Sequence, residues 1–238
     1  MRLVYGLTFA VAVALVVPSA LGAQQPQEAA RKVAGGGISI PGWQGQVDPQ
    51  EAKAGMTVDN GKLAMEGQAM KVTTGPAIVY WNPKNVAAGS YTVKATFNEP
   101  QFQNVNDHPH PYGIFVGGND MGTPNMTLVY CSAYGNGTYI MRGFGPTVFY
   151  PDPAARRPVA NAAINKAAGV GQPVKQDIAV TVTPTNVSCS INGTVVGTYD
   201  KAAVVGDGKL KSLDGVYGIR FAHNTDAFVT NFKKTKAQ

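Results

Sequence analysis

Short segments in which apolar and polar residues alternate run through most of this chain, and this pattern constrains the fold more than any other feature. Strand side chains point alternately to opposite faces, so such segments are typical of strands with one buried face. Glycine, proline, asparagine and aspartate separate the segments, as expected of turns. The pattern predicts an all-β fold, a two-sheet antiparallel β-sandwich. The expected strands are Lys62–Glu66, Met70–Thr73, Ala77–Trp81, Gly89–Asn98, Tyr112–Val116, Thr127–Tyr134, Thr138–Arg142, Gln176–Thr183, Val187–Ile191, Val195–Tyr199, Val216–Ala222 and Phe228–Phe232.

Asn-Gly pairs mark the expected hairpins. They occur at Asn60-Gly61, Asn136-Gly137 and Asn192-Gly193, each next to a β-branched or aromatic segment. Asn-Gly tolerates positive φ at both positions and fits the type I′ turn that matches strand twist. These pairs therefore predict tight antiparallel reversals.

One long segment interrupts the pattern. Gly145–Pro173 is rich in proline and alanine, and we expect an irregular loop with one short helix around Val159–Ala167. A loop this long in a compact domain is usually functional or mobile.

The N-terminus has the pattern of a secretory signal peptide. Arg2 supplies the positive charge, Leu7–Val17 is apolar, and small residues end at Ala23. The apolar stretch is short for a membrane span, and no later segment approaches that length. We expect cleavage near Gly22 or Ala23 and a secreted or periplasmic protein. An uncleaved N-terminal anchor is the alternative.

The remaining chain is expected to form one domain. Residues 24–37 are polar and Gly-rich, which is typical of a disordered leader. The β-sandwich domain spans 38–233, and 234–238 form a basic tail. The chain has 20 Lys and Arg against 14 Asp and Glu. This mild excess lacks the basic stripe interleaved with aromatic residues that is typical of nucleic-acid binders, so no nucleic acid is expected as a partner.

The chain has only two cysteines, Cys131 and Cys189. Each lies in an alternating segment, which places both side chains toward the core. In an oxidising compartment they can form one disulfide. The sequence leaves a disulfide and two buried thiols as equal alternatives.

Two of the three histidines lie in the stretch HPHPYG, at His108 and His110. Histidines two residues apart on an extended segment can share a face, but a zinc site needs three or four ligands. The only other histidine is His223. Because both precede proline, we interpret the stretch as a stiff lead into the next strand and expect no metal.

A calcium ion is a weaker hypothesis. Asn119 and Asp120 offer oxygen atoms after the strand Tyr112–Val116, but calcium takes six to eight oxygen ligands. Asp107 or Asp226 would have to approach from elsewhere. The default interpretation is a turn without a cofactor.

Motifs of common hydrolases are missing from the sequence. Glycosidases commonly use two carboxylates in one cleft, and no expected strand carries paired acids at i, i+2 or i, i+4. There is no G-x-S-x-G motif either. We therefore expect no catalytic residues. The alternative is an enzyme with scattered acids, which would be Glu66, Glu99, Asp107 and Asp120.

Aromatic residues offer the best candidate ligand site. On the strand Thr127–Tyr134, Tyr130 and Tyr134 lie on the face opposite Cys131. Aromatic rings and hydroxyl groups on one sheet face can stack sugar rings and bond their hydroxyls. Trp81 and Arg142 can contribute as a stacking surface and a hydrogen-bond donor. The alternative is that these residues pack beneath the 145–173 loop.

The motifs HPYGIFVGGNDM, LVYCSAYGNGTYIMRGF, VTVTPTNVSCSINGTVV and DGVYGIRFAHNTDAFVTNF together resemble the concanavalin A-like lectin/glucanase jelly roll. More narrowly, they are similar to laminin-G-like secreted bacterial domains. The resemblance covers about Trp43 to Phe232 and implies two stacked sheets, one concave, with glycans bound on the concave face or at loop tips. Glucanases of the superfamily carry a Glu-x-Asp-x-x-Glu pattern that does not occur here. Calcium is frequent among relatives, but no full ligand set matches.

The resulting hypothesis is a secreted, non-catalytic, carbohydrate-binding module whose partner is a glycan or cell-envelope polymer. A glycoside-acting enzyme of the same superfamily is one alternative. An envelope-associated structural protein without a small ligand is the other, and it predicts that the 145–173 loop covers the concave face. Fold alone does not decide among them.

Overall fold

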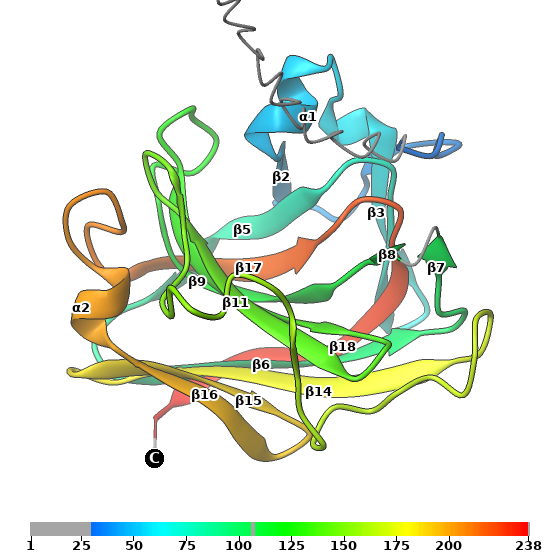
Figure 1. Cartoon of the computed structure of the whole chain (residues 1–238). Helices are drawn as coiled ribbons and strands as arrows, with labels where there is room; N and C mark the ends of the chain where they lie inside the picture. The colour runs from blue at the N-terminus through cyan, green and yellow to red at the C-terminus, as the bar shows by residue number, and fades with distance from the viewer. Residues whose placement is uncertain (1–29, 106–107, 238) are drawn as a thin grey trace, which may run out of the picture.

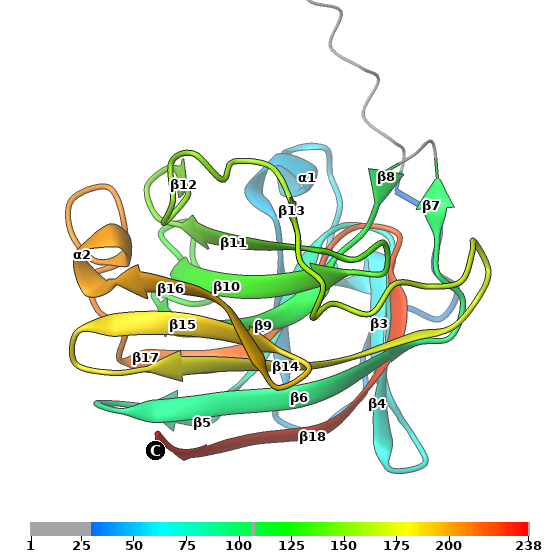
Figure 2. The ribbon, with the colours of Figure 1, turned by 60° about the horizontal axis from the view of Figure 1, so that its bottom comes forward.

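The computed structural model describes residues 30–105 and 108–237, and the predicted signal peptide lies outside them. Two eight-stranded sheets stack face to face (Figures 1 and 2). We call them sheet A and sheet B. Apart from β1, which runs parallel to β3, the strands of these two sheets pair antiparallel. The predicted all-β, two-sheet sandwich is confirmed.

Sheet A has the order β1-β3-β4-β18-β6-β14-β15-β16. Its strands are β1 (Gly37–Ile38), β3 (Gly61–Glu66), β4 (Ala69–Thr74), β18 (Asp226–Lys236), β6 (Tyr91–Glu99), β14 (Val174–Val182), β15 (Asn186–Ile191) and β16 (Thr194–Asp200).

Sheet B has the order β12-β11-β10-β9-β17-β5-β2, with β13 also pairing β11. Its strands are β12 (Val148–Phe149), β11 (Thr138–Phe144), β10 (Thr127–Tyr134), β9 (Tyr112–Asn119), β17 (Gly215–Phe221), β5 (Ile78–Ala87), β2 (Gln44–Val47) and β13 (Val159–Ala160). The short elements outside both sheets are β7 (Asn104–Val105), β8 (His108–Pro109), the helices α1 (Pro49–Lys53) and α2 (Lys201–Val204), and the 3-10 helix η1 (Val58–Asn60).

The main core lies between the sheets and follows the alternation seen in the sequence. In sheet B, Cys131 of β10 pairs with Ile114 of β9, which pairs with Ile219 of β17, and all three are fully buried. These residues belong to the same inner face because strand neighbours in register share a face. On sheet A, Val180 and Cys189 meet them from the opposite side.

A disulfide joins the two sheets. It links Cys131 of β10 to Cys189 of β15, with their Cα atoms 6.0 Å apart. Of the two alternatives that the sequence left open, the structure has the disulfide.

The outer face of sheet B is also largely buried, which alternation alone does not predict. Trp81, Phe115, Leu128 and Tyr130 form a second cluster there with Phe144. Helix α1 and strand β12 stand above this face, on the side away from sheet A (Figure 2). β10 is therefore buried along both faces and only its last residue, Tyr134, is partly exposed.

The Asn-Gly pairs form three different structures. Asn192 and Gly193 both have positive φ (51° and 83°) between β15 and β16, as a type I′ turn requires. Asn136-Gly137 also lies in a hairpin, but only Gly137 has positive φ there. Asn60-Gly61 is no hairpin: Asn60 ends η1, and its Oδ1 accepts the backbone N–H of Thr57. That prediction was wrong because the side chain of Asn60 caps a helical turn instead.

The long 145–173 segment follows the β11 edge, and its first part lies over the outer face of sheet B, where β12 stands and Tyr150 packs against the second cluster. Within it, β12 and β13 pair with β11, and Ile164 and Phe149 enter the main core. The helix expected around Val159–Ala167 is absent, since the described backbone there forms β13 and turns. Pairing with an exposed strand edge outweighs the weak helical preference of an alanine-rich stretch.

Both ends of the expected domain differ from the sequence prediction. Before β1, Arg31 of the predicted leader donates hydrogen bonds to the carbonyls of Thr74 (2.8 Å) and Thr225 (2.6 Å). At the other end, β18 continues to Lys236 and pairs with β6, so most of the predicted basic tail is strand. In the described residues, no helix is both apolar and long enough to cross a membrane.

Candidate functional site

A pocket of about 500 Å³ opens on the outer face of sheet B. We call it the Arg220 pocket. Its floor comes from β10, β11 and the end of β17, and its walls come from α1, β8 and the turn between β11 and β12. It is lined by Gln46, Asp48, Pro49, Gln50, Glu51, Ala77, His108, Pro111, Pro124, Met126, Tyr130, Tyr134, Ile140, Arg142, Phe144, Gly145, Pro146, Thr147, Val148, Arg220, Ala222 and His223.

Strand register explains why charged residues gather on this floor. Ser132 of β10 pairs with Gly113 of β9, which pairs with Arg220 of β17. Side chains in such a row point to the same face. Gly113, in the middle of the row, has no side chain and so leaves space on this face. No larger residue fits there, since a Cβ would lie 1.9 Å from the carbonyl oxygen of Cys131. The large Arg220 side chain next to it can therefore lie against the sheet.

Arg220 is the centre of the pocket floor. Its guanidinium carbon lies 4.6 Å from the centroid of the Tyr130 ring and 5.4 Å from that of Phe144, as in cation–π contacts. Its Nη2 forms an ion pair with Oδ2 of Asp48, the residue just before α1. Nη1 donates to the carbonyl of Phe221 at 3.1 Å. These contacts fix the guanidinium in one orientation.

Two carboxylates of the α1 region share the pocket. Burial raises the pKa of Asp48, and the Arg220 guanidinium opposes that rise. Burial also raises the pKa of Glu51. The backbone N–H of Ala77 donates to its Oε2 at 2.5 Å, and this hydrogen bond opposes the rise. The nearby charge of Asp48 adds to the rise in the pKa of Glu51. The pocket therefore holds two acids whose environments favour protonation more than water does.

Arg142 is the second cation of the pocket. It pairs in register with Tyr130 and lies on the same face. Its guanidinium carbon is 5.6 Å from the Tyr150 ring centroid and 5.8 Å from that of Phe144. Within the described part of the chain, its Nε is buried and has no hydrogen-bond partner. Arg142 therefore has N–H donors to offer to a ligand. The donors of Arg220, in contrast, are largely used by its contact with Asp48.

The structure brings three of the four predicted ligand-binding residues together and leaves one out. Tyr130, Tyr134 and Arg142 line the pocket. Tyr130 is 3% exposed beneath Arg220, so its ring supports the guanidinium and has no open face for stacking. Trp81 does not line the pocket and is 2% exposed in the cluster under sheet B's outer surface. Burial raises the pKa of Tyr130 and of Tyr134, so the hydroxyls of these two tyrosines stay protonated.

Sequence reasoning missed Arg220, Asp48 and Glu51. Arg220 carries a recognisable signal, a charge at an outer-face position in the otherwise apolar stretch VYGIRF. Asp48 and Glu51 lie in the polar stretch DPQE, which resembles any surface turn. Their position in the pocket depends on β2 pairing with β5, a contact between distant segments.

Three of the four acids of the scattered-enzyme alternative lie outside the Arg220 pocket. Asp120 is exposed and paired with Lys211 at 3.0 Å, while Glu99 is 2% exposed in β6. Glu66 is exposed at the end of β3. None of these three lines the Arg220 pocket, and Asp107 lies outside the described residues.

The residues of the calcium hypothesis are held by other partners. Asp120 binds Lys211, and Asp226 binds Lys71 at 2.7 Å. The Asn119 amide donates to the carbonyls of Gly117 and Asp214.

The three histidines, in contrast, meet at the rim of the pocket. Burial and the neighbouring histidines lower the pKa of His110 to about 3, so its imidazole is neutral.

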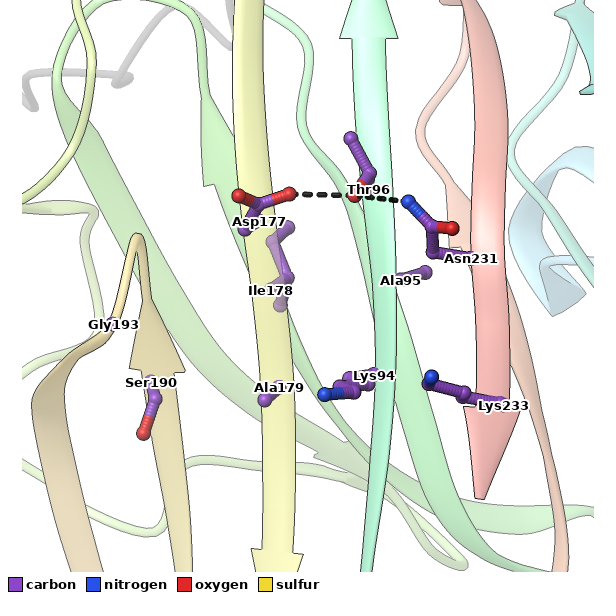
Figure 3. Close-up of a pocket in the computed structure, with 10 residues that line it drawn as sticks. All are labelled: Lys94, Ala95, Thr96, Asp177, Ile178, Ala179, Ser190, Gly193, Asn231 and Lys233. Atoms are coloured by element: carbon purple, nitrogen blue, oxygen red, sulfur yellow. Dashed lines mark hydrogen bonds between the residues drawn. The ribbon is translucent and has the colours of Figure 1, made fainter. Parts of the chain in front are cut away.

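A second pocket of about 430 Å³ lies on the outer face of sheet A (Figure 3). Lys94 of β6 and Lys233 of β18 pair in register on that face. Beside them, the Thr96 hydroxyl donates to Asp177 (2.6 Å), and the Asn231 amide donates to Thr96 (3.3 Å). None of the described residues that line this pocket is aromatic. It is therefore the less suited of the two to hold a sugar ring.

No protein-family model matches the chain, and no curated protein sequence does. Solved structures are similar at low identity. The carbohydrate-binding module CBM66 from Bacillus subtilis has a TM-score of 0.51 at 10% identity, covering 84% of this chain and 98% of that one. A Bacillus subtilis protein of unknown function with a galectin-like fold has a TM-score of 0.52 at 12% identity, covering 82% and 89%. The metal-free exoplasmic/lumenal domain of VIP36 has a TM-score of 0.51 at 12% identity, covering 86% and 90%.

These similarities show the fold. The chain has the concanavalin A-like β-sandwich that its sequence motifs resemble. The narrower likeness to laminin-G-like domains stays an expectation from the sequence.

Proposed function

We propose that this protein is an exported, non-catalytic carbohydrate-binding module whose ligand occupies the Arg220 pocket. The observation that carries the proposal is the convergence of Arg142, Tyr134 and the Arg220–Asp48 pair in one pocket with an aromatic floor. Its volume of about 500 Å³ lies within the range of about 300–1,000 Å³ that is common for small-ligand sites.

The chemistry of the pocket suits a saccharide. A sugar presents hydroxyl groups around a ring with apolar C–H surfaces. The Arg142 guanidinium and the Tyr134 hydroxyl can donate to those oxygens, and the Asp48 carboxylate can accept from hydroxyls. The apolar side chains of Met126 and Ile140 line the same pocket and can contact the C–H surfaces.

The similar structures support the proposal through their described function. The CBM66 domain is a carbohydrate-binding module and shares the sandwich over nearly its whole length. Fold alone does not carry function, so the pocket residues are the primary support.

Export is supported by two features. The N-terminal segment has the pattern of a secretory signal peptide, and the Cys131–Cys189 disulfide fits an oxidising compartment. A cell-envelope polysaccharide is accordingly the partner class we propose.

Binding to a panel of glycans and insoluble polysaccharides tests the proposal. We expect the wild-type protein to bind one saccharide class, and Arg142→Ala to lose at least about tenfold in affinity because a ligand hydroxyl loses a charged donor. Lys94→Ala, on the outer face of sheet A, is the matched control and should bind as wild type. Equal binding by wild type and Arg142→Ala, or loss of binding in Lys94→Ala alone, would overturn the placement of the site.

A second candidate function rests on the two acids of the α1 region. Asp48 and Glu51 share the pocket, and burial raises the pKa of each carboxyl, which suits a proton donor. If the protein is a glycoside-acting enzyme, Asp48 and Glu51 are better candidates for its acids than the scattered acids that the sequence suggested. The test is the release of reducing sugar from a bound polysaccharide. Release by wild type that is lost in Glu51→Gln, with binding kept, would favour catalysis over binding alone.

A further inference from the structure

All three histidines of the chain meet at one place, although His223 lies far from the other two in sequence. His108 belongs to β8, His110 precedes β9, and His223 follows β17. One ring nitrogen from each lies within 4.8 Å of the other two. The ring centroids of His110 and His223 are 4.3 Å apart, and those of His108 and His223 are 5.7 Å apart. The pairing of β9 with β17 brings the two sequence segments together.

The spacing of these nitrogens is close to that of ligands on a shared metal ion. Zinc binds histidine nitrogen at about 2.0–2.1 Å in tetrahedral geometry, which sets two ligand nitrogens about 3.3 Å apart. Nε2 of His110 and Nε2 of His223 are 3.0 Å apart. Small side-chain rotations of the exposed His108 ring would complete the set, since it is not held by a packed core.

We propose that His108, His110 and His223 form a binding site for a divalent transition-metal ion, with zinc as the ion of first choice. Three imidazole nitrogens are the donor type that zinc, copper, nickel and cobalt prefer. Calcium and magnesium require oxygen ligands and are excluded by this donor set.

Glu51 lies on the side of His223 where a carboxylate usually accompanies a metal-bound histidine. Its Oε1 is 3.7 Å from Nδ1 of His223, on the side of the ring away from the Nε2 that approaches His110. At this distance the two groups make a charge contact without a hydrogen bond, and a closer approach of the carboxylate would keep the proton on Nδ1 and leave Nε2 to bind the ion. Glu51 is itself held by the Ala77 backbone N–H. It therefore acts as a positioning residue for the site.

The site has an open coordination position next to the Arg220 pocket. The three histidines provide three ligands, and zinc commonly takes a fourth. His108 and His223 also line the pocket. A water molecule or an oxygen atom of a pocket ligand would complete the coordination. The proposal concerns metal binding, and it stands whether or not the pocket binds a saccharide.

Metal titration of the full chain without a histidine tag tests this directly, because every histidine in such a protein belongs to the site. Protein treated with a chelator and then freed of it is titrated with Zn²⁺ by calorimetry, and with Co²⁺ by visible absorption. We expect one equivalent to bind, and Co²⁺ to give the absorption of a low-symmetry site with nitrogen ligands. His110→Asn and His223→Asn should each lower the affinity at least about tenfold.

Two further measurements keep the result clear if a histidine variant folds poorly. Glu51→Gln retains all three imidazoles and should weaken Zn²⁺ binding by about 10- to 100-fold. In the wild-type protein, Zn²⁺ should shift the imidazole ¹⁵N resonances of three histidines, which requires no substitution. Asp120→Asn is the control, as this acid pairs with Lys211 elsewhere. No Zn²⁺ binding, or binding that His110→Asn and Glu51→Gln leave unchanged, would overturn the proposal.

Discussion

At the scale of single residues, the Arg220–Asp48 pair combines a structural role with a role in the pocket. The Arg220 side chain is 6% exposed and that of Asp48 is 18% exposed. Removing one partner of such a pair leaves a buried charge without compensation, which costs several kcal/mol. We expect Asp48→Ala to lower the free energy of unfolding by about 3 kcal/mol, near the lower end for buried pairs because Asp48 is partly exposed.

Urea unfolding at neutral pH measures this loss. Asp48→Asn is the companion variant, since it keeps the shape and a hydrogen-bond acceptor for Arg220 and should lose less. A change below about 1 kcal/mol in Asp48→Ala would mean that water solvates the guanidinium as well as Asp48 does.

Glu99 gives a pH dependence of stability. Burial raises its pKa to about 7, an effect opposed by the Gln103 backbone N–H, whereas its pKa in an unfolded chain is 4.5. Between these values the native state binds more protons than the unfolded state, so stability contributed by the protonated Glu99 is lost as pH rises from 4.5 to 7. Wild type should lose about 3 kcal/mol relative to Glu99→Gln over that range.

The measurement is the free energy of unfolding of both proteins at pH 4.5 and pH 8. At each pH, the free energy of unfolding of Glu99→Gln is subtracted from that of the wild type. The contributions of the other titrating groups cancel in this difference. A difference that does not change with pH would place the pKa of Glu99 near its unfolded value.

At the scale of secondary-structure elements, Gly113 shows how the sheet makes room for the pocket. A Cβ at this position would lie 1.9 Å from the carbonyl oxygen of Cys131 and 2.6 Å from Cα of Ser132. Because these are backbone atoms, β9 and β10 would have to separate. We expect Gly113→Ala to cost about 2–3 kcal/mol, as for overpacked cores.

Thermal unfolding compares this variant with Gly169→Ala, whose Cβ would meet only the Gln172 side chain at 4.0 Å. Gly169→Ala should leave stability nearly unchanged. If Gly113→Ala is equally harmless, the strands have more freedom to separate than their register implies.

The sequence predicts strands well where the alternation is local. The bounds of β10 agree with the expected Thr127–Tyr134, and each of the other expected strands has an observed counterpart. Short elements such as β2 and α1 were missed, because a few polar residues carry no periodicity. Asp48 and Glu51 are in that region, so the acidic side of the pocket was missed with them.

Strand order accounts for the other half of the site. Tyr130, Tyr134 and Arg142 were found because β10 and β11 form a hairpin, whose register follows from neighbouring residues. Arg220 and His223 reach the same place only because β17 lies between β9 and β5. A single sequence does not contain that order, so the histidines of HPHPYG were interpreted as isolated.

At the scale of the whole molecule, the two sheets are held together by one core and one covalent link. The core between them contains large, fully buried side chains such as Tyr80, Phe97 and Tyr112. The pocket and the histidine cluster lie outside this core, on the far side of sheet B. Substitution of a partly exposed pocket residue such as Arg142 should therefore affect ligand binding more than folding, whereas Tyr130 and Phe144 also belong to the second buried cluster.

The disulfide between Cys131 and Cys189 acts on the whole molecule because it closes a loop of 58 residues between the sheets. Loop-closure entropy predicts that removing such a link costs about 4 kcal/mol, mainly by giving the unfolded chain more conformations. We expect this loss in the double variant Cys131→Ala with Cys189→Ala, measured by urea unfolding. The same mechanism predicts a larger dependence of the unfolding free energy on urea, since an unlinked unfolded chain exposes more surface. A loss of stability with no change in that slope would assign the effect to packing around the buried sulfur atoms of the native state instead.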